Sequence, residues 1–389
     1  FVIGLSAGAT VLVGQAWGAK NVEKVRCVVG STLFMTLIGG TLIALLGVIF
    51  TKYILQALGT APDVLHLSVP YVQWMLAGSP LLFIYIIYTS ILRGVGDSTT
   101  PLIASAMTIG TGLIITPVLI LGKFGFPKLG IIAPAIATII GFLIALIFLY
   151  FYLNKTNHPL RPDLALIKHI RHQPELSKII LRLGIPTGIQ MMTTSIAGLV
   201  IVGLVNRYGA DATAAYGAVN QVLNYIQFPA LSISIAASIF AAQAIGAGKS
   251  ELLNKVTRTA LGMNIAITGT LVTLAYLFSK YLMALFITDP QVVALGQQLL
   301  FIVLWSILFF GASAIFASIM RASGTVTVPM IINIVAILFI EVPFAYLFSE
   351  WWGLKGIWYA YALAFVSLCI LQGLYYQFFW KKKTVTALI

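Results

Sequence analysis

One acidic side chain, Glu341, lies within an otherwise apolar run, ILFIEVPFAYLF at residues 337–348. If so apolar a run lies in a bilayer, a charge at its centre costs about 2.5–3.5 kcal/mol on insertion scales. The run holds no Lys or Arg to offset that cost, and burial away from a cation favours the protonated form of a carboxyl. Pro343 removes a backbone donor two residues later and is expected to kink the helix there.

We therefore predict that Glu341 binds and releases a proton as access to it changes. The alternative is that Glu341 is a neutral carboxyl that only forms structural hydrogen bonds, or that it lies nearer the headgroups.

Amides and hydroxyls recur at helical spacing in other apolar runs. Tyr216, Asn220, Asn224 and Gln227 follow one another at intervals of four, four and three residues, which places them on one face of a helix. Thr187, Gln190 and Thr194 do the same in the preceding run, and Asn333 lies two turns before Glu341. Because lipid-facing amides are costly, these faces should turn toward protein or water.

These polar faces either line a cavity for a polar or cationic ligand or form interhelical hydrogen bonds. The residues predicted to bind substrate are Gln190, Thr194, Tyr216, Asn220, Asn224, Gln227 and Asn333.

The composition indicates which elements must position these residues. Of 389 residues, 60% are hydrophobic and 8% are charged, whereas a soluble domain carries about 25% charged residues. No soluble fold of this length hides so much apolar surface, so we predict a polytopic membrane protein. Apolar runs of about 20 residues predict spanning helices, whereas a β-barrel would show short alternating strands. The runs cover roughly 27–50, 65–91, 101–121, 129–152, 179–205, 211–245, 257–287, 291–319, 329–349 and 356–380, with a shorter one at 1–17.

The net charge of +13 is distributed unevenly along the chain. If the runs alternate in direction, 17 Lys and Arg residues fall on one side, which includes the loops of Arg93 and Arg321 and the C-terminus. The six on the other side are Lys52, Lys123, Lys128, Arg207, Lys280 and Lys355. The positive-inside rule makes the first side cytoplasmic. We therefore expect a multi-pass protein of a bacterial inner membrane, with a charge that reports topology rather than nucleic-acid binding.

Two phrases, LRGVGDSTTP at 92–101 and MRASGTVTVP at 320–329, share the spacing Arg, two residues, Gly, four residues, Pro, and lie 228 residues apart. The order of Gln and Gly in GQAWGAK also recurs at that offset in AQAIGAGK. We expect these residues to have a structural role at cytoplasmic helix ends, where the basic ones complement the helix dipole. They are Gln15, Gly18, Arg93, Gly96, Pro101, Gln243, Gly246, Arg321, Gly324 and Pro329.

The repeat predicts the domain organisation. Six runs separate the two phrases, so the chain returns to the same side, and two parallel six-helix lobes are expected, related by an axis along the membrane normal. We predict an N-lobe at 1–152, a basic linker at 153–178 and a C-lobe at 179–389. The offset also leads us to expect that the first helix and the start of the second are missing from this chain.

The linker is the only substantial polar stretch. Asp163 is expected to cap a short amphipathic helix that begins at Leu164. His169 and His172 have an H-x-x-H spacing, which either belongs to a solvated linker or could contribute to a metal site. We favour the linker and expect no metal.

The repeated phrases resemble a known family. GQAWGAKN at 14–21 and AQAIGAGK at 242–249 are similar to the Q-A-x-G-A signature of multidrug and toxic compound extrusion (MATE) transporters. LRGVGDSTTP resembles that family's R-G-x-G-D-x-x-x-P loop, and LGIPTGIQ at 183–190 resembles the start of its second lobe. The resemblance implies a V-shaped pair of six-helix lobes that exports amphiphilic, often cationic compounds by antiport against protons or sodium.

The chain departs from that family in its carboxylates. Where some members carry Asp before the Pro of the fifth helix, this chain has Thr116 before Pro117, and where others carry Glu in the seventh helix, it has Thr194. A single carboxylate with uncharged neighbours, such as Glu341, suits a proton better than a sodium ion, which needs several oxygens. We therefore favour H⁺ over Na⁺ as the coupling ion and expect no cofactor.

The leading hypothesis is a secondary antiporter for drugs or toxic metabolites that works by alternating access. A flippase for a lipid-linked substrate would need cations in its cavity to hold phosphates, and the predicted cavity residues include no Lys or Arg. An intramembrane enzyme would need convergent His, Cys or paired carboxylates at one depth, and no ATP-binding loop is present. The expected partners are the lipid bilayer and a small amphiphilic or cationic substrate, with the protein a monomer.

Overall fold

The computed structural model describes residues 1–389 and consists of helices and their connections. Nine helices are long and apolar enough to cross a membrane, or ten if one bent pair counts as a single span. Each of the ten long apolar runs of the sequence coincides with one of these spans, so the all-α polytopic fold class is confirmed. The chain divides into two compact units, Phe1–Gly184 and Ile185–Ile389. The predicted linker limits, 153–178, stay a prediction.

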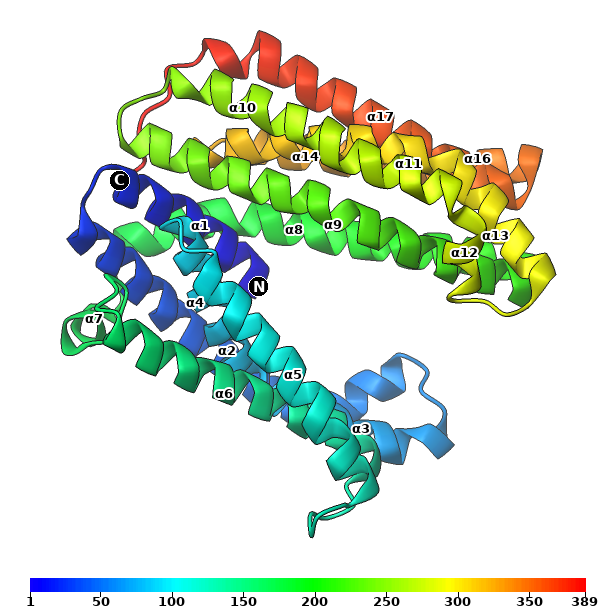
Figure 1. The fold of residues 1–389 in the computed structure, drawn as a ribbon, viewed down its shortest axis with the longest axis horizontal. Helices are drawn as coiled ribbons and strands as arrows, with labels where there is room; N and C mark the ends of the chain where they lie inside the picture. Colours follow the sequence, from blue (N-terminus) through cyan, green and yellow to red (C-terminus); the bar gives the residue numbers. More distant parts are fainter. The chain divides into compact units, whose positions relative to one another are not determined.

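In the first unit α1 packs against α2 and α4, and α5 packs along α6 (Figure 1). Its helices are α1 (Val2–Gly18), α2 (Val22–Ala57), α3 (Pro62–Ala77), α4 (Ser79–Gly94), α5 (Thr99–Leu121), η1 (Gly130–Ile132), α6 (Ala133–Lys155), α7 (Leu164–His169) and the first part of α8 (Pro174–Val205).

The sequence predicted one run at 65–91, and the structure bends it by 44° between α3 and α4. The break falls at Gly78, and Pro80 is near the first position of α4. A proline ring clashes with the carbonyl four residues before it and has no N–H to donate, which favours a kink or break at this point.

In the second unit α9 runs beside α14, which in turn packs against α17 (Figure 1). Its further elements are η2 (Asn206–Tyr208), α9 (Ala210–Gly246), α10 (Leu252–Met263), η3 (Asn264–Thr268), α11 (Gly269–Leu277), α12 (Ser279–Ala284), α13 (Pro290–Val303), η4 (Leu304–Ser306), α14 (Ile307–Ala322), α15 (Thr327–Val335), η5 (Ala336–Glu341), α16 (Val342–Trp352), α17 (Leu354–Phe378) and η6 (Trp380–Lys382). Two of these, η3 and η5, are π-helical segments inside longer spans.

The duplicated Gln and Gly residues end two helices in the same way. α1 ends at Gly18 and α9 ends at Gly246, and the backbone carbonyls of Gln15 and Gln243 accept from the N–H four residues on, at 3.0 and 2.9 Å. Lys20 and Gly248, 228 residues apart, both have positive φ, +58° and +71°. A residue in the left-handed region just after a helix lets the chain turn while its last carbonyls stay paired.

The second duplicated phrase also forms equivalent turns. Arg93 and Arg321 lie in the last turns of α4 and α14, and each backbone carbonyl accepts from a glycine N–H at 2.9 Å. Those glycines, Gly96 and Gly324, have φ of +95° and +87°, a conformation that glycine adopts without a steric penalty. Pro101 and Pro329 then lie in the first turns of α5 and α15, where a missing N–H costs little.

The polar segment after α6 is held against the start of α2. Asp163 is the N-cap of α7 and accepts from the backbone N–H of Leu166 at 2.8 Å, which confirms the predicted cap. Its carboxylate also pairs with Arg161 at 3.2 Å and with Arg26 of α2 at 3.3 Å. The backbone N–H and these cations lower the pKa of Asp163. The segment is therefore docked by its own cap and by an ion pair.

Candidate ion-coupling site

Glu341 is the last residue of the π-helical segment η5, which separates α15 from α16. Pro343 follows at the start of α16 and cannot donate the backbone hydrogen bond that a regular helix requires there. π-turns inside longer helices occur frequently at functional sites. The Glu341 side chain is half-buried and forms no ion pair with any Lys or Arg. The carboxyl thus lies at a break in a spanning helix without a counter-charge.

A pair of tyrosines lies next to this carboxyl. The Tyr216 hydroxyl of α9 and the Tyr361 hydroxyl of α17 are hydrogen-bonded at 2.9 Å. Tyr361 is within electrostatic range of Glu341, and α17 packs directly on η5. Tyr361 therefore lies near Glu341 and is hydrogen-bonded to Tyr216, which lies on a helix more than a hundred residues earlier. Together these three residues are called the carboxyl–tyrosine cluster below.

Trp358 packs against both tyrosines of the carboxyl–tyrosine cluster. Its ring centroid lies 5.3 Å from that of Tyr216 and 5.5 Å from that of Tyr361, and its side chain is completely buried. Such tilted aromatic contacts add about 0.5–1.5 kcal/mol beyond simple burial. Because Trp358 and Tyr361 are three residues apart, α17 presents both from one face. The two hydroxyls are therefore held in a rigid aromatic setting.

Three buried side-chain polar atoms of this unit have no hydrogen-bond partner within the chain: the Oδ1 oxygen of Asn333, the indole Nε1 of Trp358 and the Oε1 oxygen of Gln372. Buried polar atoms are nearly always paired, so unpaired ones mark places where a ligand or solvent group can be held. Asn333 lies on α15, in the same span as Glu341, and Trp358 packs against both tyrosines. The surroundings of the cluster therefore offer one free acceptor and one free donor.

The remaining predicted substrate residues stay outside this cluster. On α9, Asn220 and Gln227 are half-buried and Asn224 is exposed, whereas Tyr216 is buried. On α8, Gln190 is half-buried and Thr194 is exposed, and the Thr194 hydroxyl donates to the backbone carbonyl of Gln190 at 3.0 Å. The structure thus links Tyr216 to Tyr361, the tyrosine near Glu341, and leaves the other polar side chains of α8 and α9 half-buried or exposed.

The sequence alone did not single out Tyr361 or Trp358. Both lie in the aromatic-rich stretch IWYAYALAF, where a tyrosine looks like any other membrane aromatic. The available signal was their spacing of three residues on one helix face, but nothing local indicated that this face packs on Glu341.

Duplicated units of apolar spans, with a lone carboxyl at a helix break, are features of membrane transport proteins. The MatE family model matches residues 1–118 and 186–347, and the chain belongs to this family.

Known relatives match along nearly the whole chain. The sequence is 44% identical over 392 residues to "Probable multidrug resistance protein YoeA" of Bacillus subtilis (strain 168), covering 100% of this chain and 84% of the relative. It is 29% identical to "Probable multidrug resistance protein YpnP" of the same organism, covering 97% of this chain and 83% of that protein.

Among solved structures, an outward-facing "multidrug resistance MATE family transporter of the MOP superfamily" superposes with a TM-score of 0.90 at 21% identity, covering 98% of this chain and 85% of that one. The predicted family and the two-lobe, all-α fold class are thereby confirmed.

Proposed function

We propose that this protein exports amphiphilic, cationic compounds across a bacterial inner membrane in exchange for protons, with Glu341 as the proton-coupling residue. The observation that carries the proposal is the position of Glu341, a carboxyl without a cationic partner at the π-helical break of a spanning helix. The names of the relatives, which describe multidrug resistance proteins, support the export of drugs.

Antiport follows from competition for one carboxyl. In its charged form Glu341 attracts the cationic group of a substrate, and in its protonated form it loses that attraction. A single carboxyl can hold a proton or pair with a substrate cation but not both, so binding of one ligand promotes release of the other. Asn333 and the polar side chains of α8 and α9 would then supply contacts to the uncharged parts of the substrate, with Gln190, Thr194, Asn220, Asn224 and Gln227 as candidates.

The break beside Glu341 gives the span a place to bend. The π-helical segment η5 and Pro343 interrupt the regular hydrogen-bond ladder between α15 and α16, and sharp helix bends concentrate at such points. In this proposal, protonation removes the charge at the break and shifts the balance between two arrangements of the span. Alternating access requires a two-state element of this kind.

The charge distribution supports an orientation with the Arg93 and Arg321 loops and the C-terminus in the cytoplasm.

Two competing functions would require different groups at the site. Sodium coupling would need several oxygen ligands around Glu341, and a flippase for a lipid-linked phosphate would need cations among the candidate binding residues, which carry none. We therefore favour proton-coupled export by a monomer.

Transport by reconstituted protein in vesicles tests the proposal. Uptake of a fluorescent organic cation is driven first by a pH gradient and then by a sodium gradient, in the native protein, in Glu341→Gln and in Glu350→Gln. Glu350 is a matched control because it is an exposed acid on α16, nine residues from Glu341. We expect Glu341→Gln to lose pH-driven uptake and Glu350→Gln to retain it. Native pH-driven uptake in Glu341→Gln, or uptake that follows only the sodium gradient, contradicts the proposal.

A further inference from the structure

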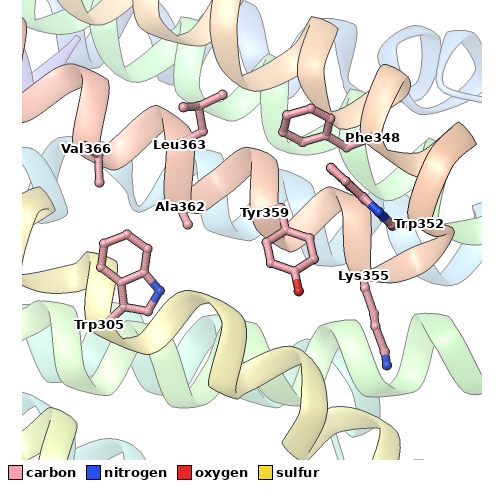
Figure 2. Close-up of a pocket in the computed structure, with 8 residues that line it drawn as sticks. All are labelled: Trp305, Phe348, Trp352, Lys355, Tyr359, Ala362, Leu363 and Val366. Atoms are coloured by element: carbon pink, nitrogen blue, oxygen red, sulfur yellow. The ribbon is translucent and has the colours of Figure 1, made fainter.

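The second unit has an elongated surface cavity that the proposed transport site does not use. The cavity, called the α17 groove below, has a volume of about 650 Å³ and lies between η4, α16 and α17 (Figure 2). Its walls include Trp305 of η4, Phe348 and Trp352 of α16, and Lys355, Tyr359 and Val366 of α17. Volumes of 300–1,000 Å³ are typical of sites for small amphiphilic molecules.

The α17 groove opens to the surroundings of the unit rather than into its core. The side chains of Trp305, Trp352 and Tyr359 are 45%, 53% and 44% exposed, although all three lie in or at the end of apolar spans. Exposed aromatics that gather in one patch mark sites of interaction with proteins or membranes. In a membrane protein the medium beside such a span is lipid, so lipid molecules have direct access to this groove.

The two ends of the α17 groove differ in polarity. Lys355 is the single charged side chain among the lining residues, and the opposite end is apolar, with Leu363 and Val366 (Figure 2). Val366 lies eleven positions after Lys355 on α17, which corresponds to about 16 Å at 1.5 Å per residue. The hydrocarbon core of a bilayer is about 30 Å thick. The groove thus matches the depth of one leaflet, with its cation at the headgroup level.

Aromatic side chains gather at the same end as Lys355. The ring centroids of Trp352 and Tyr359 lie 5.5 Å apart, and Trp351 and Trp352 meet at 5.7 Å. Tryptophan and tyrosine are enriched at the boundary between hydrocarbon and headgroups. A basic side chain at this boundary, next to a cleft between helices, is suited to an anionic lipid headgroup.

We propose that the α17 groove binds one glycerophospholipid with an anionic headgroup, whose phosphate pairs with Lys355 and whose acyl chain lies along Trp305, Leu363 and Val366. The charge of Lys355 disfavours the organic cations of the proposed transport site, so the groove is a separate site. Under the proposed orientation, Lys355 is on the non-cytoplasmic side and the lipid belongs to the outer leaflet of that membrane.

The first unit provides an internal comparison. A cavity of about 560 Å³ lies at the corresponding corner, with Tyr71, Ile120, Ile131 and Pro134 in its walls and no charged side chain among them. The segment LGIIAPA from Leu129 corresponds to KGIWYAY from Lys355, so the repeat places a leucine where the α17 groove has its cation. We therefore expect headgroup selectivity only in the second unit.

Native mass spectrometry of the whole purified protein tests the site, with phosphatidylglycerol and phosphatidylethanolamine of identical acyl chains as probes. For the first lipid bound, we expect the native protein to prefer phosphatidylglycerol about five-fold, the value for one lysine near a membrane surface. Lys355→Gln should abolish the preference, and Lys280→Gln, a control on the same predicted side, should retain it. Val366→Trp, which fills the apolar end, should lower occupancy by both lipids.

Equal affinity for phosphatidylglycerol in the native protein and Lys355→Gln overturns the proposal, as does equal affinity of the native protein for the two lipids. Displacement of phosphatidylglycerol by a fluorescent organic cation at equal concentration would show instead that the groove holds transport substrates. Because Lys355 is exposed at a helix end, Lys355→Gln should fold normally, so the result does not depend on Val366→Trp.

Discussion

The hydrogen bond between Tyr216 and Tyr361 gives a quantitative test of the carboxyl–tyrosine cluster. Removing one hydroxyl breaks a part-buried 2.9 Å bond and leaves the other hydroxyl without its partner, which costs up to about 1–3 kcal/mol. Removing both leaves no unpaired group, so the double variant should lose less than the two single variants together. Hydrogen bonds between membrane helices show coupling energies of about 0.6 kcal/mol on average and up to about 1.7 kcal/mol, and we expect a value in this range.

The assay is reversible unfolding in mixed micelles of Tyr216→Phe, Tyr361→Phe and the double variant. Tyr276→Phe is the matched control, because its hydroxyl donates to the backbone carbonyl of Phe301 at 3.0 Å and has no part in the cluster. Tyr216→Phe and Tyr276→Phe should be additive within about 0.5 kcal/mol. Full additivity of Tyr216→Phe and Tyr361→Phe would refute the reasoning, since the two hydroxyls would then not interact.

Three further predictions concern packing and the polar segment after α6. Gly356→Ala should destabilise the fold by about 1–3 kcal/mol, because a Cβ there would overlap the backbone carbonyl of Phe348. Gly262→Ala is the control, since its Cβ meets open space, and it should be neutral or stabilising. Thermal melting compares the two variants. Asp163→Ala should speed limited proteolysis near α7 about five-fold at neutral pH, because a lost N-cap costs about 1 kcal/mol. An unchanged rate of cleavage would mean that the cap does not hold the segment. Burial lowers the pKa of His158 below 6.5 despite the attraction of Asp97. The contribution of neutral His158 to stability is therefore complete above about pH 6.5 and is lost as the pH falls below that value. Hydrogen exchange around residue 160 should show this loss, and His158→Gln should abolish the pH dependence.

The positions of the spans could be predicted from the sequence because composition alone determines them. Runs of about 20 apolar residues have one stable location, a bilayer, and one stable backbone there, a helix. The repeat could also be predicted from the sequence. Gly96 and Gly324 occupy turns that have a positive φ, and because glycine suits such turns, it occurs at the same place in both copies. These features depend on local chemistry, which a sequence displays directly.

The details of the site depend on contacts between distant helices, which a sequence displays poorly. Glu341 stood out because a lone acid in an apolar run is rare, but Tyr361 did not, because a tyrosine in an aromatic-rich helix has many structural roles. The π-helical segment that ends at Glu341 was also not predicted from the sequence. Its extra residue changes which face each side chain takes, and the segment packs against α17, a helix distant in the sequence from α15.

The most direct test of the central claim is infrared difference spectroscopy of the native protein and Glu341→Gln in lipid, before and after addition of a transported organic cation. We expect the native protein to lose the band of one protonated carboxyl when the substrate binds, and Glu341→Gln to show no such change. A protonated-carboxyl band that persists on substrate binding, or one that disappears equally in Glu341→Gln, would show that the proton is carried by another residue.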